Sequence, residues 1–99
     1  MDEFRSASTK LLWDVSSENL KIFNAAQRAA LYAIDEAIFH EPAEALKIQL
    51  ETLKISDEVI TRLGGLKILE KKPTETDKMA FYKWAICTRY SALKEKIAA

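Results

Sequence analysis

The chain has 99 residues, of which 48% are apolar and 30% charged, and its 15 Lys/Arg balance its 15 Asp/Glu to a formal net charge of +0. This length accommodates one domain and excludes two, and the zero net charge excludes a global field toward nucleic acid or an anionic membrane. Only two glycines and two prolines are present, which disfavours a many-stranded sheet. Composition therefore predicts an all-α fold, a compact bundle of about five helices forming a single domain over residues 1–99.

Residues 1–15 predict a short helix that ends near Asp14 and that could be only loosely attached to the rest of the domain. Ser17 then suits the N-cap of a long helix, with Glu18 in its favourable first turn. Apolar side chains and one amide recur along one face of this helix at steps of three and four, namely Leu20, Phe23, Gln27, Leu31, Ile34 and Ile38. Because Pro42 disfavours helix at the residue before it, the helix should end near His40.

Residues 42–69 predict two short helices that meet at a polar turn. Pro42 suits the first turn of one helix, and Ser56 is predicted to cap the other. The inward faces of the two helices are predicted from a leucine stripe and an apolar cluster, namely Leu46, Leu50 and Leu53, then Val59, Ile60 and Leu63. Gly64 is placed to end the second helix in a left-handed conformation, and residues 66–69 form a further turn.

A final helix is predicted after Lys71, Lys72 and Pro73 break the pattern. Thr74 and Asp77 have the spacing of a capping box. The helix then carries a regular stripe, namely Met79, Tyr82, Ile86, Tyr90, Leu93 and Ile97. Phe81 and Trp84 lie off this stripe, so they either form a second packing face or remain partly exposed.

The chain has no pattern that predicts catalysis, a cofactor or a metal site. His40 is the only histidine and Cys87 the only cysteine, which excludes a histidine metal cluster and an internal disulfide. Cys87 lies in an apolar helical pattern, where a thiol usually acts as a small core residue. No apolar segment reaches the length of a membrane span, and the first residues show no secretory signal pattern. We therefore expect a non-enzymatic intracellular protein of the cytoplasm or the nucleus.

Residues 46–98 carry several short motifs in a defined order. These are a leucine stripe at 50–53, a turn at 55–56, a short helix with Val59 and Ile60, a glycine–lysine segment at 64–67 and a basic turn at 70–72. In this order they resemble the N-terminal helical domain of transcription elongation factor TFIIS, a fold shared by the integrase-binding domain of LEDGF. The chain differs from that pattern at Leu63, where the family has Thr, and it lacks the Trp near the C-terminus. The resemblance implies a helical bundle that docks short disordered motifs, often a Phe flanked by acidic residues.

The resemblance also implies a docking groove between the inter-helix turns, near residues 54–55 and 69–72. The candidate partner-binding residues come from these turns and from two aromatic positions of the last helix, namely Lys54, Ile55, Leu66, Lys67, Leu69, Lys71, Lys72, Phe81 and Trp84. We therefore expect a protein–protein interaction module that docks acidic and aromatic peptide motifs. Its family context implies a transcription-associated scaffold.

Two alternatives remain open at the level of sequence. The alanine-rich helix over residues 17–40 and the stripe over residues 79–97 could pack across a dimer axis, as in a small self-associating structural or regulatory protein of phage or bacterial type. A lysine-rich surface over residues 67–89 could bind nucleic acid weakly. This second alternative is less favoured, because the segment after Gly65 is apolar and does not suit a helix that reads DNA.

Overall fold

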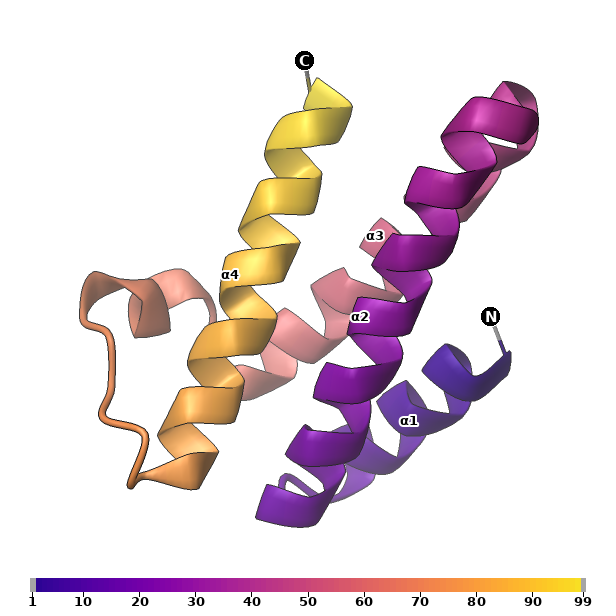
Figure 1. Ribbon diagram of the computed structural model, residues 1–99. Coiled ribbons are helices and arrows are strands. Elements are labelled where there is room, and N and C mark those ends of the chain that lie inside the picture. The colour runs from indigo at the N-terminus through magenta and orange to yellow at the C-terminus, as the bar shows by residue number, and fades with distance from the viewer. Residues whose placement is uncertain (1, 99) are drawn as a thin grey trace.

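The computed structural model describes the backbone of residues 2–98 and the side chains of residues 2–97, and this part of the chain is all-helical. It contains four α-helices and one short 3₁₀-helix: α1 (Asp2–Trp13), α2 (Ser17–His40), α3 (Pro42–Leu63), η1 (Leu66–Glu70) and α4 (Lys78–Ala98). Helices α2 and α3 form a long hairpin, and α1 and α4 pack against it (Figure 1). The predicted all-α bundle is confirmed, with one α-helix fewer than the five that the sequence suggested.

Helix α1 is an integral part of the bundle. Its side chains Phe4, Ala7 and Leu11 are buried in the core that also holds Phe23 of α2. Carbonyl groups at its C-terminal end accept hydrogen bonds from other parts of the fold. The Arg62 guanidinium donates to the Leu12 carbonyl at 3.2 Å, and the Asn19 side chain donates to the carbonyl of Asp14, the residue after the helix, at 2.9 Å. Side-chain donors of this kind satisfy the carbonyls that a helix end leaves unpaired. Residues 2–13 are therefore held by packing and by hydrogen bonds, whereas the sequence allowed a loosely attached segment.

The N-cap of helix α2 lies one residue earlier than predicted. The N-cap is Ser16, whose hydroxyl oxygen accepts a hydrogen bond from the Asn19 amide at 3.1 Å. The helix ends at His40, as the position of Pro42 predicts, and Pro42 then occupies the first turn of α3. The α2–α3 hairpin is thus closed by a turn that consists only of Glu41 between the two helices.

Helix α3 is continuous, so the predicted polar turn at residues 55–56 is wrong. Ser56 lies in the interior of the helix with 1% of its surface exposed, and it caps nothing. Residues 43–63 contain no glycine or proline, and helix-forming residues on both sides of Ser56 continue the helix. One break that the sequence suggested is therefore absent, and the two predicted short helices are one helix of 22 residues.

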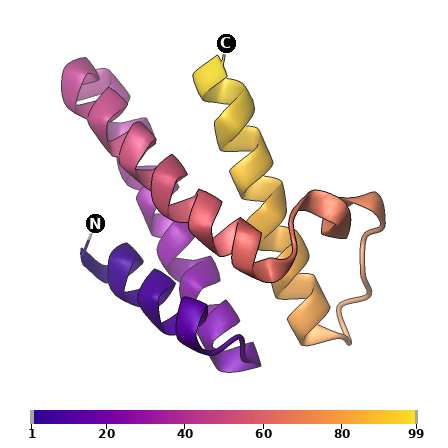
Figure 2. The same ribbon diagram turned by 180° about the vertical axis from the view of Figure 1, so that it is seen from behind.

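The predicted inward stripe of this helix is also wrong in its first half. Leu46 and Leu50 are about half exposed, at 53% and 51%, whereas Ala45, Thr52 and Ser56 are buried. Small and short polar residues allow α2 to approach this face of α3 closely. The closed end of the α2–α3 hairpin extends beyond α1 (Figure 2), whereas Leu50 lines the groove between α1 and α3 and remains half exposed there.

The end of α3 and the start of α4 are set by specific caps. Gly64 and Gly65 have φ values of +105° and +87°, and their amides donate to the carbonyls of Thr61 and Ile60 at 3.2 and 2.9 Å. This is the Schellman arrangement, which confirms the predicted left-handed helix end. The N-cap of α4 is Asp77, whose carboxylate accepts a hydrogen bond from the Ala80 amide at 3.2 Å, so the predicted cap at Thr74 is displaced by three residues.

The left-handed conformation of Gly64 leads to a stability prediction. A Cβ atom at this position would meet no heavy atom within 4 Å, so the cost of a side chain is that of the backbone conformation alone. We expect Gly64→Ala to lower the free energy of unfolding by about 1 kcal/mol. Gly64→Asn should lower it less, since Asn tolerates positive φ better. Urea denaturation followed by circular dichroism measures both, and equal losses would show that the conformation of residue 64 is not the cause.

The core lies where all four α-helices meet. Its largest fully buried side chains come from all four helices and include Leu11, Phe23, Ile34, Val59 and Ile86. From the predicted stripe of α4, Ile86, Tyr90 and Leu93 are buried, while Met79 is 36% exposed. Among the described helices, none combines the length and the apolar character needed to cross a bilayer.

Candidate functional site

The described residues bring together no chemistry-bearing cluster. Nowhere among residues 2–97 do three His, Cys, Asp or Glu side chains lie where they could hold a metal ion. Cys87 is fully buried in the core, and this burial raises the pKa of its thiol to about 11. A thiol with such a pKa is protonated at neutral pH and is therefore a poor nucleophile. The candidate functional surfaces are consequently grooves between helices.

Two of the larger grooves involve α1. The groove between α1 and α2 has a volume of about 600 Å³ and a floor of small side chains such as Ala25 and Ala29. The groove between α1 and α3 has a volume of about 540 Å³, and an ion pair between Arg5 and Glu51 joins its two walls. The predicted site residues Lys54 and Ile55 line this second groove. A ligand there would have to displace or accommodate the ion pair.

The third groove lies between η1 and the first turns of α4, and we call it the η1–α4 groove. Its volume is about 540 Å³. Its apolar surface comes from the end of α3, from η1, from the following loop and from α4, namely Leu63, Ile68, Pro73, Met79 and Ala80. This volume falls within the range of pockets that hold small ligands or single large side chains. Met79 supplies a flexible, polarizable side chain, which adapts readily to different apolar partners.

Positive charge surrounds this apolar surface. Lys67, Lys71 and Lys83 line the groove, with Glu70 and Asp77 as the acidic lining residues. The carboxylate of Asp77 is already engaged as the cap of α4. Residues 67–83 as a whole carry five lysines against three acidic residues. The groove therefore offers an apolar surface to a ligand whose flanking groups are negatively charged.

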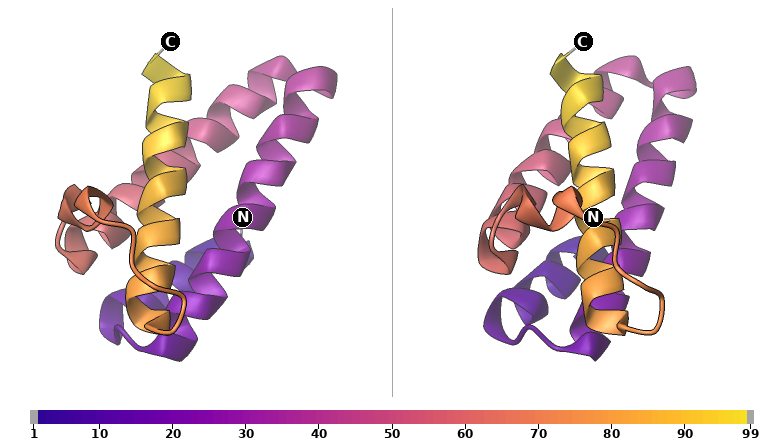
Figure 3. Two further views of the ribbon diagram at one scale, coloured as in Figure 1. Left: turned by 60° about the vertical axis from the view of Figure 1, so that its left-hand side comes forward. Right: turned by 90° about the vertical axis from the view of Figure 1, so that its left-hand side faces the viewer.

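The η1 wall and the α4 wall of the groove face each other because the chain reverses its direction between them. The Gly64–Gly65 turn directs η1 away from α3, and residues 71–77 swing out and return to the start of α4 (Figure 3). Residues 79, 80 and 83 then share the face of α4 that is turned toward η1. The groove consequently depends on the glycine turn that the sequence singled out.

The aromatic residues of α4 lie outside this groove. Phe81 contacts Trp84 with ring centroids 6.1 Å apart, and the Lys72 ammonium lies 5.1 Å from the centroid of the Trp84 ring. Phe81 and Trp84 are each half-buried. Neither is among the residues that line the η1–α4 groove, although Trp84 lies one helical turn after Ala80 on α4.

The nine predicted partner-binding residues are therefore distributed over three surfaces. Lys67 and Lys71 line the η1–α4 groove, with the exposed Leu66 next to Lys67 in sequence. Leu69 is half-buried against the core. Lys54 and Ile55 lie in the α1–α3 groove. Phe81 and Trp84 of α4 form a separate cluster with Lys72 of the preceding loop.

Several lining residues of the η1–α4 groove were missed at the level of sequence. Met79 was assigned to the core stripe of α4, and Lys83 was not selected. The available signal was the helical spacing of residues 79, 80 and 83, which places them on one face. Whether η1 packs beside that face depends on the path of the loop over residues 71–77, and no local pattern in that loop indicates its path.

Two polar side chains of α4 are engaged with neighbouring helices. The Arg89 guanidinium donates to the Asn24 side chain, and burial, with a smaller contribution from Arg28, lowers the pKa of Arg89. The Tyr90 hydroxyl donates to the Asp57 carboxylate, and this hydrogen bond, together with burial, raises the pKa of Tyr90 to about 12. Arg89 is thus committed to an interhelical contact, which separates it from the lysines of the predicted basic surface.

Comparison of the chain with protein-family profiles, with curated proteins and with solved structures gives no match.

Proposed function

We propose that this protein is a non-enzymatic docking module whose η1–α4 groove binds a short peptide with an aromatic or large apolar side chain flanked by acidic residues. The observation that carries the proposal is the combination of an apolar surface with Lys67, Lys71 and Lys83 on the same groove. An apolar anchor supplies most of the affinity of such a contact, and surrounding charges supply orientation and selectivity.

The resemblance to TFIIS-type domains implies the same class of ligand, namely acidic motifs that contain Phe. It now depends on the glycine–lysine segment and the basic turn, because α3 is continuous through residues 55–56. One of the two places that the resemblance implies for the groove, residues 69–72, adjoins the η1–α4 groove. A transcription-associated scaffold in the cytoplasm or the nucleus is the cellular role that we attach to this proposal.

A peptide titration tests the proposal. We expect an acidic peptide with a central Phe to shift the backbone NMR signals of residues 66–71 and 78–83 in the ¹⁵N-labelled protein. The double variant Lys67→Glu/Lys71→Glu should weaken binding by about tenfold or more, because it replaces two attractive charges with repulsive ones. Both lysines are exposed, so the fold should be unaffected.

Matched controls separate a specific groove from general charge attraction. Lys10→Glu/Lys21→Glu makes the same charge change on exposed lysines of α1 and α2, and it should leave binding within about twofold. A peptide with Ser in place of Phe should also lose binding. Equal weakening by both double variants, or signal shifts confined to the α1–α3 groove, would contradict the proposal.

A further inference from the structure

The closed end of the α2–α3 hairpin exposes large aromatic side chains. Phe39 has 85% and Tyr32 has 68% of its surface exposed, and Leu46 of α3 is exposed as well. A buried aromatic side chain removes about 150–250 Å² from water, so an exposed one retains a large potential contribution to binding. Single exposed apolar residues are ordinary, but here three lie near one end of two paired helices.

The same end of the hairpin is acidic. Residues 32–47 carry four acidic side chains, Asp35, Glu36, Glu41 and Glu44, against one lysine. Asp35 is paired with Lys96 of α4 at 2.9 Å, and Glu36 accepts a hydrogen bond from Tyr32 at 3.2 Å. Glu41 and Glu44 are exposed on either side of Pro42 and lie close to Phe39 in sequence. We call Phe39 with Glu36, Glu41 and Glu44 the acidic hairpin end.

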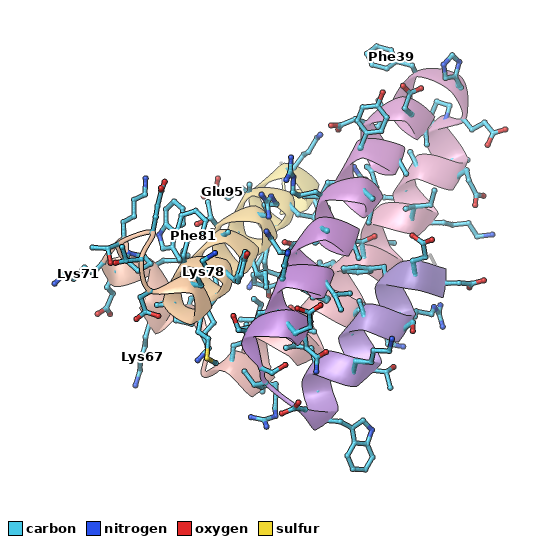
Figure 4. The ribbon with its side chains drawn as sticks, turned by 60° about the horizontal axis from the view of Figure 1, so that its bottom comes forward. Phe39, Lys67, Lys71, Lys78, Phe81 and Glu95 are labelled. Atoms are coloured by element: carbon cyan, nitrogen blue, oxygen red, sulfur yellow. The ribbon has the colours of Figure 1, made fainter. Side chains whose placement is uncertain are left out.

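The acidic hairpin end has the chemistry of the ligand that the η1–α4 groove fits. It presents an exposed Phe flanked by carboxylates, whereas the groove presents an apolar surface flanked by lysines. The two surfaces lie at opposite ends of the molecule, with Phe39 at one end and Lys67 and Lys71 at the other (Figure 4). One chain therefore cannot fill its own groove with its own hairpin end.

We infer that a second copy of this chain docks its acidic hairpin end into the η1–α4 groove. The inference rests on the proposed function, because it names an occupant for the same groove. The contact joins two different surfaces, so each added copy leaves one groove and one hairpin end free. Such a heterologous contact continues into a ring or an open chain instead of stopping at a two-fold dimer.

The contact is small, and its strength should reflect this. It consists of one aromatic anchor and a few charged neighbours, which corresponds to the class of transient interfaces below about 1,200 Å². The association should therefore depend on concentration, and added salt should weaken it because the charged groups on both surfaces are exposed.

Sedimentation velocity of two complementary variants tests the inference. Phe39→Ser removes the aromatic anchor of the acidic hairpin end and leaves the η1–α4 groove unchanged. Lys67→Glu/Lys71→Glu reverses the charge of two lining residues of the groove and leaves the anchor unchanged. Wild-type protein should show a sedimentation coefficient that rises with concentration beyond that of two chains. Each variant alone should remain monomeric at the same concentrations, with a loss of affinity of about tenfold or more. An equimolar mixture should form a complex of one chain of each and nothing larger.

Specific results would overturn the inference. Self-association of the groove variant alone, at wild-type strength, would show that the groove is not the acceptor. A wild-type protein that stays monomeric at all concentrations would also overturn it, even if an acidic peptide bound the groove, and the proposed function would then stand. Conversely, an acidic peptide that fails to bind the Phe39→Ser monomer would contradict the proposed function. Circular dichroism of both variants should match wild type, since all three positions are exposed.

Discussion

Phe23→Ala is expected to lower the free energy of unfolding by about 3–5 kcal/mol, the largest single effect that the fold predicts. Phe23 is fully buried in the first third of α2, and its ring lies 5.0 Å from that of Phe4, centroid to centroid. The substitution therefore leaves a cavity and removes an aromatic contact between α1 and α2. A domain of this size has about 5–15 kcal/mol of stability in total, so the variant should be close to unfolding.

Phe39→Ala is the matched control. It makes the same chemical change in the same helix, but Phe39 is 85% exposed, so we expect a change within about 0.5 kcal/mol. Urea denaturation of the three proteins, followed by circular dichroism at low protein concentration, measures both effects without a contribution from self-association. Comparable losses in the two variants would mean that the packing of α1 against α2 does not stabilise the fold as described.

Gln27→Glu is expected to lower the free energy of unfolding by about 3 kcal/mol at neutral pH. Gln27 is buried at the α2–α4 interface with 1% of its surface exposed, and its amide donates to the Ile86 carbonyl at 3.2 Å. Its own carbonyl oxygen has no hydrogen-bond partner among the described residues. A carboxylate at this place would be an unpaired buried charge, which is much more costly than a neutral amide.

The loss of unfolding free energy in Gln27→Glu should become larger as the pH rises. Burial raises the pKa of such a carboxyl group in the folded state above its unfolded value of about 4.3. The penalty relative to wild type should therefore be small at about pH 3, where the group is mostly protonated in both states. It should grow as the pH rises above the unfolded pKa and become constant above the higher pKa of the folded state. Urea denaturation of both proteins across this range measures the difference directly.

Gln27→Met provides the control for side-chain length. It removes the unpaired carbonyl oxygen and the amide while keeping an unbranched chain, and the Ile86 carbonyl retains its place in the helical ladder of α4. We expect it to raise the free energy of unfolding by about 1 kcal/mol at all pH values, because the desolvation of the unpaired oxygen outweighs one neutral hydrogen bond. A Glu variant with no pH dependence relative to wild type would show that position 27 is accessible to water.

The helix ends were the most predictable part of this structure. Pro42 and Gly64 each act through local geometry: a ring that fixes φ and a residue that accepts positive φ. Such effects involve only a few neighbouring residues, so they can be recognised from spacing. The cap of α4 was less predictable, since Asp77 fills the place expected for Thr74. The absence of a break at Ser56 was missed because a serine that could cap a helix can also lie inside one.

The buried faces were predictable in part. Leu20, Phe23 and Ile34 of α2 are buried as their spacing indicates, and so are Ile86 and Tyr90 of α4. Leu46 and Leu50 have equally good spacing, yet each is about half exposed, and Leu50 lies at the edge of the groove between α1 and α3. Helical periodicity identifies an apolar face, but burial depends on whether another element packs against that face.

The candidate site also combines features that local sequence determines with features that depend on tertiary packing. The glycine turn and the lysines that follow it are local properties of the chain, and they were sufficient to predict a helix end and a basic segment after it. The grouping of Lys67, Lys71, Met79 and Lys83 around one groove was decided by the tertiary structure, as was the position of Phe39 at the opposite end. The physical reason is that both arrangements depend on how helices far apart in the sequence pack together, and packing is a property of complementary surfaces that no single segment contains.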